Sequence, residues 1–326
     1  MRDSPLHWQK ILTQGFSSSA ELLTYLNLPV PNHLDAVEQQ FKTRVPRGFA
    51  ALMEPGNPHD PLLLQVLAQS QELDPREGFV VDPLQEAQAN PVTGLLHKYQ
   101  GRVLLTLTGS CAINCRYCFR RHFPYQENNP GRQGWYKALD YIAADASIHE
   151  VILSGGDPLL VKDEVLMSLL LRLETIPHVK TLRIHSRIPV VLPERVTSEL
   201  LQVLTDSRLQ LVIVLHSNHP RELDTRVESA CQALRQIGCH VLNQSVLLAG
   251  VNDQADTLQA LSQRLFQLGV LPYYLHVLDK VQGSAHFEVS LPRAQEIYAQ
   301  LQCLLPGYLV PKLVREQAGK AHKTLV

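Results

Sequence analysis

The sequence predicts an α/β fold, a partial (β/α)6 barrel that follows a helical N-terminal extension. Six apolar, strand-like segments alternate with helix-like segments from about residue 96 onward. Polar residues gather just after most of these segments, which is where a barrel of this kind carries its chemistry. The first 95 residues are rich in proline and glycine and lack this alternation, so they form a separate region.

The N-terminal extension, residues 1–95, is expected to be helical but irregular. Ser18 followed by Glu21 resembles a capping box and predicts that a helix begins there. Asp60 followed by Pro61 predicts a second helix, because proline is favoured at the first helical position. We expect this region to wrap the barrel rather than to form an independent catalytic domain.

The barrel, residues 96–310, is expected to hold a parallel sheet buried by helices, since strands that alternate with helices pair in parallel through right-handed crossovers. A tail, residues 311–326, follows it. A helical face carries Trp135, Leu139 and Ile142. The strands are predicted at 102–108, 150–154, 180–185, 210–215, 240–247 and 273–277, and the later helices at 163–173, 193–204, 221–237 and 253–268.

Composition excludes several classes of protein. Apolar residues make up 45% of the chain and charged residues 19%, which argues against disorder. The net charge of −1 predicts no binding to nucleic acid or to an anionic membrane surface. No apolar run is long enough for a membrane span, and the N-terminus lacks the core of a secretory signal, so a cytoplasmic protein is expected. Three isolated cysteines are predicted to be small core residues: Cys231, Cys239 and Cys303.

The other three cysteines, Cys111, Cys115 and Cys118, form a Cys-x3-Cys-x2-Cys run directly after the first barrel strand. In a reducing compartment such a group predicts a metal site. Three thiolates on a four-iron cluster leave one iron open to a ligand. The alternative is a zinc site that His122 completes as a Cys3His set. The position of the loop in a large barrel, rather than in a small metal-dependent unit, favours the cluster.

Further polar residues follow the later strands. Gly155, Gly156 and Asp157 come directly after the second strand, where glycine lets a ligand approach the backbone. His216 ends the fourth strand and Gln244 lies in the fifth. Because the carboxyl ends of parallel strands meet at one end of a barrel, these residues predict a single central site.

These motifs resemble those of radical S-adenosylmethionine (SAM) enzymes. Several segments resemble, more closely, the lysine 2,3-aminomutase family, and the resemblance covers nearly everything from about residue 90. It implies a radical SAM barrel that uses a [4Fe–4S] cluster, SAM and pyridoxal 5′-phosphate (PLP) to convert L-lysine into β-lysine. The segments are HKYQGR at 97–102, FRR at 119–121, SRIPVVLP at 186–193, NQSVLLAGVND at 243–253 and GYLVP at 307–311.

The ending REQAGKAHKT, residues 315–324, resembles a subgroup of that family that makes β-lysine for modification of elongation factor P. This implies a functional link to the lysylation ligase of that factor and a cellular electron donor. Since no cysteine follows Cys303, the zinc-bearing tail of some relatives is absent, and a monomer or homodimer is expected.

The resemblance also implies a role for each candidate residue. Lys323 is the lysine that carries PLP, with Lys320 and Lys280 as competing candidates. In place of these roles, Arg120 could belong to a solvated basic patch, and each acid could be an ordinary surface residue. The implied sets are Cys111, Cys115 and Cys118 for the cluster; Gly155, Gly156 and Asp157 for SAM; His216 and Gln244 near SAM and PLP; Lys98, Tyr99 and Arg102 for the phosphate; Arg120 for the substrate carboxylate; and Asp279 and Glu316 for the substrate ammonium.

Two positions depart from the wider family. Lys98 stands where the better-known aminomutases have arginine, and Glu316 stands where lysine-specific members have aspartate. A lysine keeps the positive charge but loses the planar fork that binds phosphate through two hydrogen bonds. The alternatives that stay open are a glutamate or arginine 2,3-aminomutase and a non-catalytic iron–sulfur or zinc-binding protein.

Overall fold

The computed structural model describes residues 7–32, 34–125 and 131–326. Its centre is an open sheet of nine strands in sequential order. The parallel part runs from β2 to β8, while β1 and β9 pair antiparallel with the strands beside them. The strands are β1 (Leu95–Tyr99), β2 (Arg102–Thr108), β3 (Glu150–Gly155), β4 (Thr181–Ser186), β5 (Gln210–His216), β6 (His240–Leu247), β7 (Leu271–Val277), β8 (Lys312–Arg315) and β9 (Thr324–Leu325).

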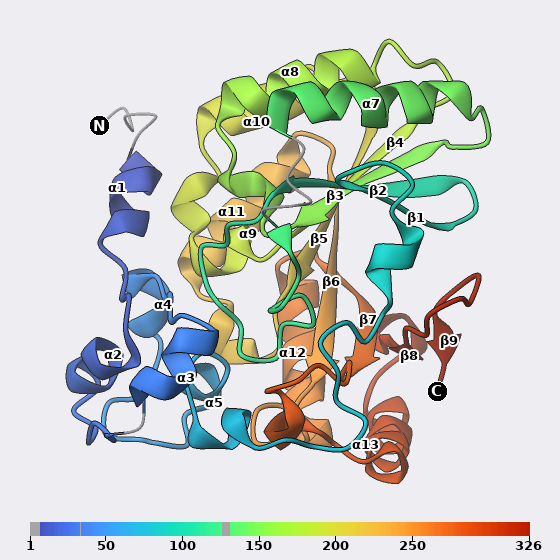
Figure 1. Ribbon diagram of the computed structural model, residues 1–326. Coiled ribbons are helices and arrows are strands. Elements are labelled where there is room, and N and C mark those ends of the chain that lie inside the picture. Colours follow the sequence, from blue (N-terminus) through green and yellow to red (C-terminus); the bar gives the residue numbers. More distant parts are fainter. Residues whose placement is uncertain (1–6, 33, 126–130) are drawn as a thin grey trace.

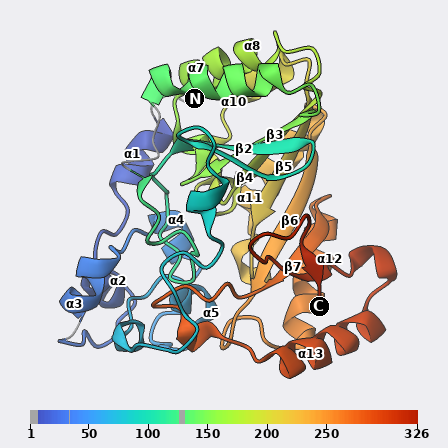
Figure 2. The same cartoon turned by 45° about the vertical axis from the view of Figure 1, so that its right-hand side comes forward.

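The helices follow the strands around the curved sheet. Figures 1 and 2 show α7 and α8 beside its upper end and α12 and α13 beside its lower end. Leu166, Leu169, Leu170 and Leu173 are buried at helical spacing on α8, which is why that helix packs on the sheet. The helices are α7 (Gly131–Ala144), α8 (Asp163–Leu173), α9 (Ile188–Val191), α10 (Ser198–Thr205), α11 (Thr225–Gln236), α12 (Ala255–Gln267) and α13 (Leu291–Leu304), with 3-10 turns η3 (Pro158–Leu160), η4 (Pro193–Arg195), η5 (Pro220–Glu222), η6 (Ala285–Phe287) and η7 (Gly307–Leu309).

The N-terminal extension forms short helices that share one hydrophobic core with the sheet and its helices. Both predicted caps are confirmed: the Ser18 side chain accepts from the backbone N–H of Glu21, and Asp60 caps a helix that begins at Pro61. The elements are α1 (His7–Thr13), α2 (Ser19–Tyr25), α3 (Leu34–Gln40), α4 (Arg47–Ala50), α5 (Pro61–Leu64), η1 (Ser70–Leu73) and η2 (Glu86–Ala89).

The predicted partial barrel is confirmed, with a wider sheet than expected. All six predicted strands are present within one or two residues, but β1, β8 and β9 were missed. The predicted helices over 193–204 and 221–237 are each divided into a 3-10 turn and an α-helix. In the second case Asp224 accepts from the backbone N–H groups of Arg226 and Val227, so that the helix begins after it.

One core prediction was wrong. Cys231 and Cys239 are buried, but Cys303 is exposed. It lies on α13, whose buried face carries Ala294, Ile297 and Leu301. A residue two positions after Leu301 turns away from that face. In the described part of the chain, every helix is too short or too polar to span a bilayer.

Candidate active site

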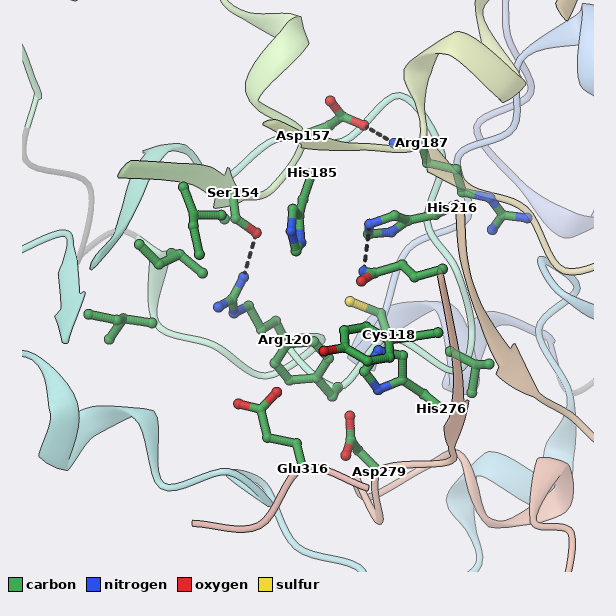
Figure 3. Close-up of a pocket in the computed structure, with 18 of the residues that line it drawn as sticks. Cys118, Arg120, Ser154, Asp157, His185, Arg187, His216, His276, Asp279 and Glu316 are labelled. Carbon is green, nitrogen blue, oxygen red and sulfur yellow. Dashed lines mark hydrogen bonds between the residues drawn. The ribbon is translucent and has the colours of Figure 1, made fainter. Parts of the chain in front are cut away.

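One cavity of about 540 Å³ is lined by residues at the carboxyl ends of the strands and also by the first residues of β2 and β3. Every residue to which the resemblance assigns a role lines it. Figure 3 shows side chains from opposite walls pointing into the same space. The residues brought together are Lys98, Tyr99, Arg102, Cys111, Cys115, Cys118, Arg120, Gly155, Gly156, Asp157, His216, Gln244, Asp279, Glu316 and Lys323. Of the two competing lysines, Lys320 lines a neighbouring cavity of about 440 Å³, and Lys280 pairs with Glu288.

The cysteine loop follows β2 and is held by the N-terminal extension. The backbone N–H of Arg116 donates to the Gln65 carbonyl at 2.9 Å, and that of Asn114 to the Arg44 carbonyl at 3.0 Å. The fully buried Arg116 side chain pairs through two donors with Glu72, which also accepts from Arg121. Removing Glu72 would leave two buried cations without an anionic partner, which is costly. These ion pairs therefore hold the cysteine loop against the N-terminal extension.

The surroundings of Cys111 and Cys118 disfavour the ionised thiolate when no cation is bound. Burial raises the pKa of Cys111 well above its ordinary value, and burial together with Cys115 raises the pKa of Cys118 to about 11. A bound metal cluster supplies the positive charge that such thiols need to bind as thiolates. Arg187 donates from Nη1 to the Cys115 sulfur at 2.7 Å.

The zinc alternative gains no support from the geometry. Nε2 of His122 lies 3.1 Å from the Gln282 carbonyl oxygen, so the ring is used elsewhere.

The Gly155–Gly156–Asp157 segment packs directly against the start of the cysteine loop. The backbone N–H of Gly156 donates to the Thr108 carbonyl and that of Asp157 to the Ser110 carbonyl, both at 2.8 Å. A Cβ at Gly156 would lie 2.3 Å from the Ser110 carbonyl oxygen, so only glycine allows this approach. Gly155 has φ of +114°, which a side chain would strain.

Asp157 serves mainly to join strands. Its carboxylate accepts from the Ser186 hydroxyl at 2.7 Å and from the Arg187 backbone N–H at 2.8 Å (Figure 3). Burial nevertheless raises its pKa to about 6. These contacts hold the end of β4 beside the end of β3, which shapes the cavity wall near the cysteines.

Three histidines face the cavity from β4, β5 and β7 (Figure 3). His216 Nε2 lies 2.8 Å from Gln244 Nε2, and burial lowers the pKa of His216 to about 3, so the ring is neutral. His185 was expected at this end of the barrel because it ends its strand, but no role was assigned to it, and His276 was not predicted. Their buried Nε2 atoms have no hydrogen-bond partner among the described residues, and burial lowers both pKa values. A buried polar atom without a partner indicates a place for a ligand.

Cations and anions alternate along one wall. Arg120 pairs with Glu86, Glu86 with Lys98, Lys98 with Glu316, and Glu316 with Lys323. Burial would raise the pKa of Glu316, but the charges of Lys323 and Lys98 outweigh it and lower the value to about 2. Glu316 is therefore ionised and pairs with Lys323.

Two predicted residues lie beside this row. The Arg102 guanidinium stacks on the Tyr99 ring, 4.7 Å from its centre. Asp279 is enclosed by protein around the cavity but makes no ion pair with another described residue. Burial, followed by the nearby charge of Glu316, raises the pKa of Asp279 to about 7. A cation bound in the cavity would stabilise the ionised form of Asp279 and could pair with it.

Comparison with known proteins agrees with this geometry. The radical SAM superfamily model matches residues 105–261. L-lysine 2,3-aminomutase from Haemophilus influenzae is 52% identical over 98% of this chain and 95% of its own length. The enzyme of the same name from Escherichia coli is 51% identical over 97% of this chain and 93% of its own length. That from Clostridium subterminale is 39% identical over 85% of this chain and 67% of its own length. The chain therefore belongs to the L-lysine 2,3-aminomutase family of the radical SAM superfamily.

Proposed function

We propose that this protein is an isomerase that moves the α-amino group of L-lysine to C3 and forms β-lysine. Its cofactors are a [4Fe–4S] cluster, SAM and PLP. One observation supports the substrate above all. The carboxyl groups of Asp279 and Glu316 point into the cavity from the side opposite Ser154, and Arg120 lies between them (Figure 3). Such a cavity can take a molecule with a carboxylate at one end and an ammonium at the other.

The residues fit each cofactor. Three cysteines of one loop line the cavity, and three thiolate ligands suit a cluster with one open iron. Gly155, Gly156 and Asp157 line the cavity beside that loop, where SAM would bind. Lys323 reaches the same cavity as Lys98 and Arg102, so one aldehyde and one phosphate group could be held together. When bound, the cluster and SAM supply hydrogen-atom abstraction, and PLP supplies the covalent attachment that permits the nitrogen to migrate.

The chain's own residues then bind, orient and exchange partners. Arg120 binds the substrate carboxylate through N–H donors at the edge of its planar guanidinium. Asp279 and Glu316 bind the ε-ammonium, since a buried ammonium without partners would be very costly. Glu316 holds Lys323 before the substrate arrives, so release of this pair frees one carboxylate for the substrate. The neutral rings of His185, His216 and His276 offer hydrogen bonds without adding charge.

The proposal extends to the use of the product, the electron donor, the compartment and the assembly. We propose that β-lysine serves the modification of elongation factor P through its ligase, as the resemblance of residues 315–324 implies. A cellular electron donor would reduce the cluster. Because the thiols must stay reduced, the cytoplasm is the expected compartment. A monomer or homodimer is the expected assembly.

The test is anaerobic reconstitution with iron, sulfide, PLP and SAM, followed by product analysis on lysine, glutamate and arginine. We expect β-lysine from lysine alone. Asp279→Asn and Glu316→Gln should each abolish lysine turnover without loss of iron. Turnover of glutamate or arginine in place of lysine, or full lysine activity in both variants, would contradict the proposal.

A further inference from the structure

A carboxylate from the N-terminal extension, Glu86, joins two cations of the cavity. The Glu86 side chain is only 3% exposed. It accepts from Arg120 Nε at 2.7 Å and Nη2 at 2.8 Å, and from Lys98 Nζ at 2.8 Å. Burial would raise the pKa of Glu86, but Arg120 and Lys98 outweigh it and lower the value. Glu86 is thus a fixed negative charge between the two side chains.

The contacts of Arg120 leave a defined part of its guanidinium for a ligand. Arginine has five N–H donors in a planar fork. Glu86 takes two of them, and the Ser154 hydroxyl oxygen accepts a third from Nη1 at 3.0 Å (Figure 3). No other described residue accepts from Arg120, so two donors remain, which is the number that a two-pronged contact with a carboxylate requires. The guanidinium also lies over the Phe119 ring, 4.9 Å from its centre, so its plane is held.

The N–H donors of Lys98 are likewise shared between protein carboxylates and a ligand. Its ammonium has three donors. One goes to Glu86 at 2.8 Å and another to Glu316 at 3.0 Å. One donor remains for a phosphate oxygen. Because Glu86 Oε1 serves Arg120 Nη2 and Lys98 Nζ together, any shift of Glu86 moves both cations.

We propose that Glu86 is a positioning residue that sets Arg120 for the substrate carboxylate and Lys98 for the cofactor phosphate, and so couples the two subsites. This inference rests on the proposed function, which gives Arg120 and Lys98 those ligands. It makes the N-terminal extension part of the active site. A purely electrostatic role has the opposite consequence, because removal of a negative charge would strengthen the binding of both anions.

Glu86→Gln keeps the size of the side chain and removes its charge. Two measurements separate positioning from charge: the Kd of PLP, titrated by absorbance without SAM or lysine, and the KM and kcat for L-lysine in the complete enzyme. We expect both Kd and KM to rise about tenfold or more, because hydrogen bonds to charged groups are lost. We expect a smaller change in kcat. Glu86→Asp keeps the charge but is one methylene too short to reach both cations. Its Kd for PLP and KM for lysine should therefore lie between those of the wild type and those of Glu86→Gln.

The matched control is Asp163→Asn, which removes the carboxylate that pairs with the buried Arg195 at 2.7 Å, outside the cavity. We expect it to leave both constants unchanged. Unchanged or lowered constants in a folded Glu86→Gln protein would overturn the proposal. If that variant does not fold, wild-type constants in Glu86→Asp would overturn it. A wild-type protein without lysine turnover counts against the proposed function, whereas an active wild type with an unaffected variant counts against Glu86 alone.

Discussion

Replacing Asp279 with asparagine is expected to stabilise the ligand-free protein at neutral pH while it removes activity. The Asp279 carboxyl has no ion-pair partner among the described residues, and burial with the nearby charge of Glu316 raises its pKa from 3.8 to about 7. The folded state therefore binds a proton more tightly than the unfolded state between these two values. Stability falls as the pH rises through this window, because ionisation costs more in the folded state.

The size of the effect follows from the pKa difference. At 1.36 kcal/mol per pKa unit, a rise from 3.8 to about 7 corresponds to about 4 kcal/mol at pH 8 and about 2 kcal/mol at pH 5. Water in the cavity screens the charge, so these are upper values. Asparagine has nearly the same shape and never ionises. We therefore expect Asp279→Asn to gain between about 1 and 4 kcal/mol at pH 8, and clearly less at pH 5.

Urea unfolding of the ligand-free wild type and variant at both pH values measures this directly. In the complete wild-type enzyme, kcat/KM for lysine should rise with pH through about 7, since the ammonium needs an ionised partner. Lysine turnover should be lost in Asp279→Asn. A variant that is less stable than the wild type at pH 8, or whose relative stability does not depend on pH, would refute the reasoning.

Three further predictions concern the lysine, the arginine beside the cluster and the glycine segment. Lys323→Ala should remove the absorbance of lysine-bound PLP while Lys320→Ala keeps it, and the reverse result would contradict the assignment of Lys323. Arg187→Met should lower the free energy of unfolding by about 3 kcal/mol in urea, because it leaves the buried Glu222 carboxylate without its cation; a loss below about 1 kcal/mol would argue against this. Gly156→Ala should lower the iron and sulfide content after reconstitution, since its Cβ would meet the cysteine loop, whereas Gly307→Ala, with open space around it, should not. Equal iron content in the two glycine variants would show that the close approach at Gly156 is not needed.

The cysteine loop and the polar strand ends could be predicted because their signals are local. Each lies directly after an apolar strand, and parallel strands bring their carboxyl ends together. Only the order of strands and helices along the chain is needed for this prediction, so an error of one or two residues at a strand end does not affect it. It placed residues as distant as Cys111 and Gln244 in one cavity.

Glu86 could not be predicted in this way. It lies in a 3-10 turn of a loop-rich region, and its partners Arg120 and Lys98 come from the cysteine loop and β1. No periodicity links an isolated acid to a cation 34 residues away. His276 was missed for a different reason, because one polar residue inside an apolar strand predicts nothing about which wall of a cavity it faces.

The missed strands also have physical causes. β8 and β9 are only four and two residues long, and they form because neighbouring strands offer an unpaired edge rather than because of their own pattern. Their pairing still matters for function. β8 leads directly into Glu316, and Lys323 comes immediately before β9, so the antiparallel pair brings the two side chains together.

The central claim is that the α-amino nitrogen of lysine becomes the β-amino nitrogen of the product. The most direct measurement is conversion of L-lysine labelled with nitrogen-15 only at the α-amino group, followed by mass and magnetic resonance analysis of the product. The account predicts β-lysine whose β-amino nitrogen carries the full label and whose ε-amino nitrogen carries none. Absence of β-lysine, or loss of the label to ammonia in solution, would contradict it.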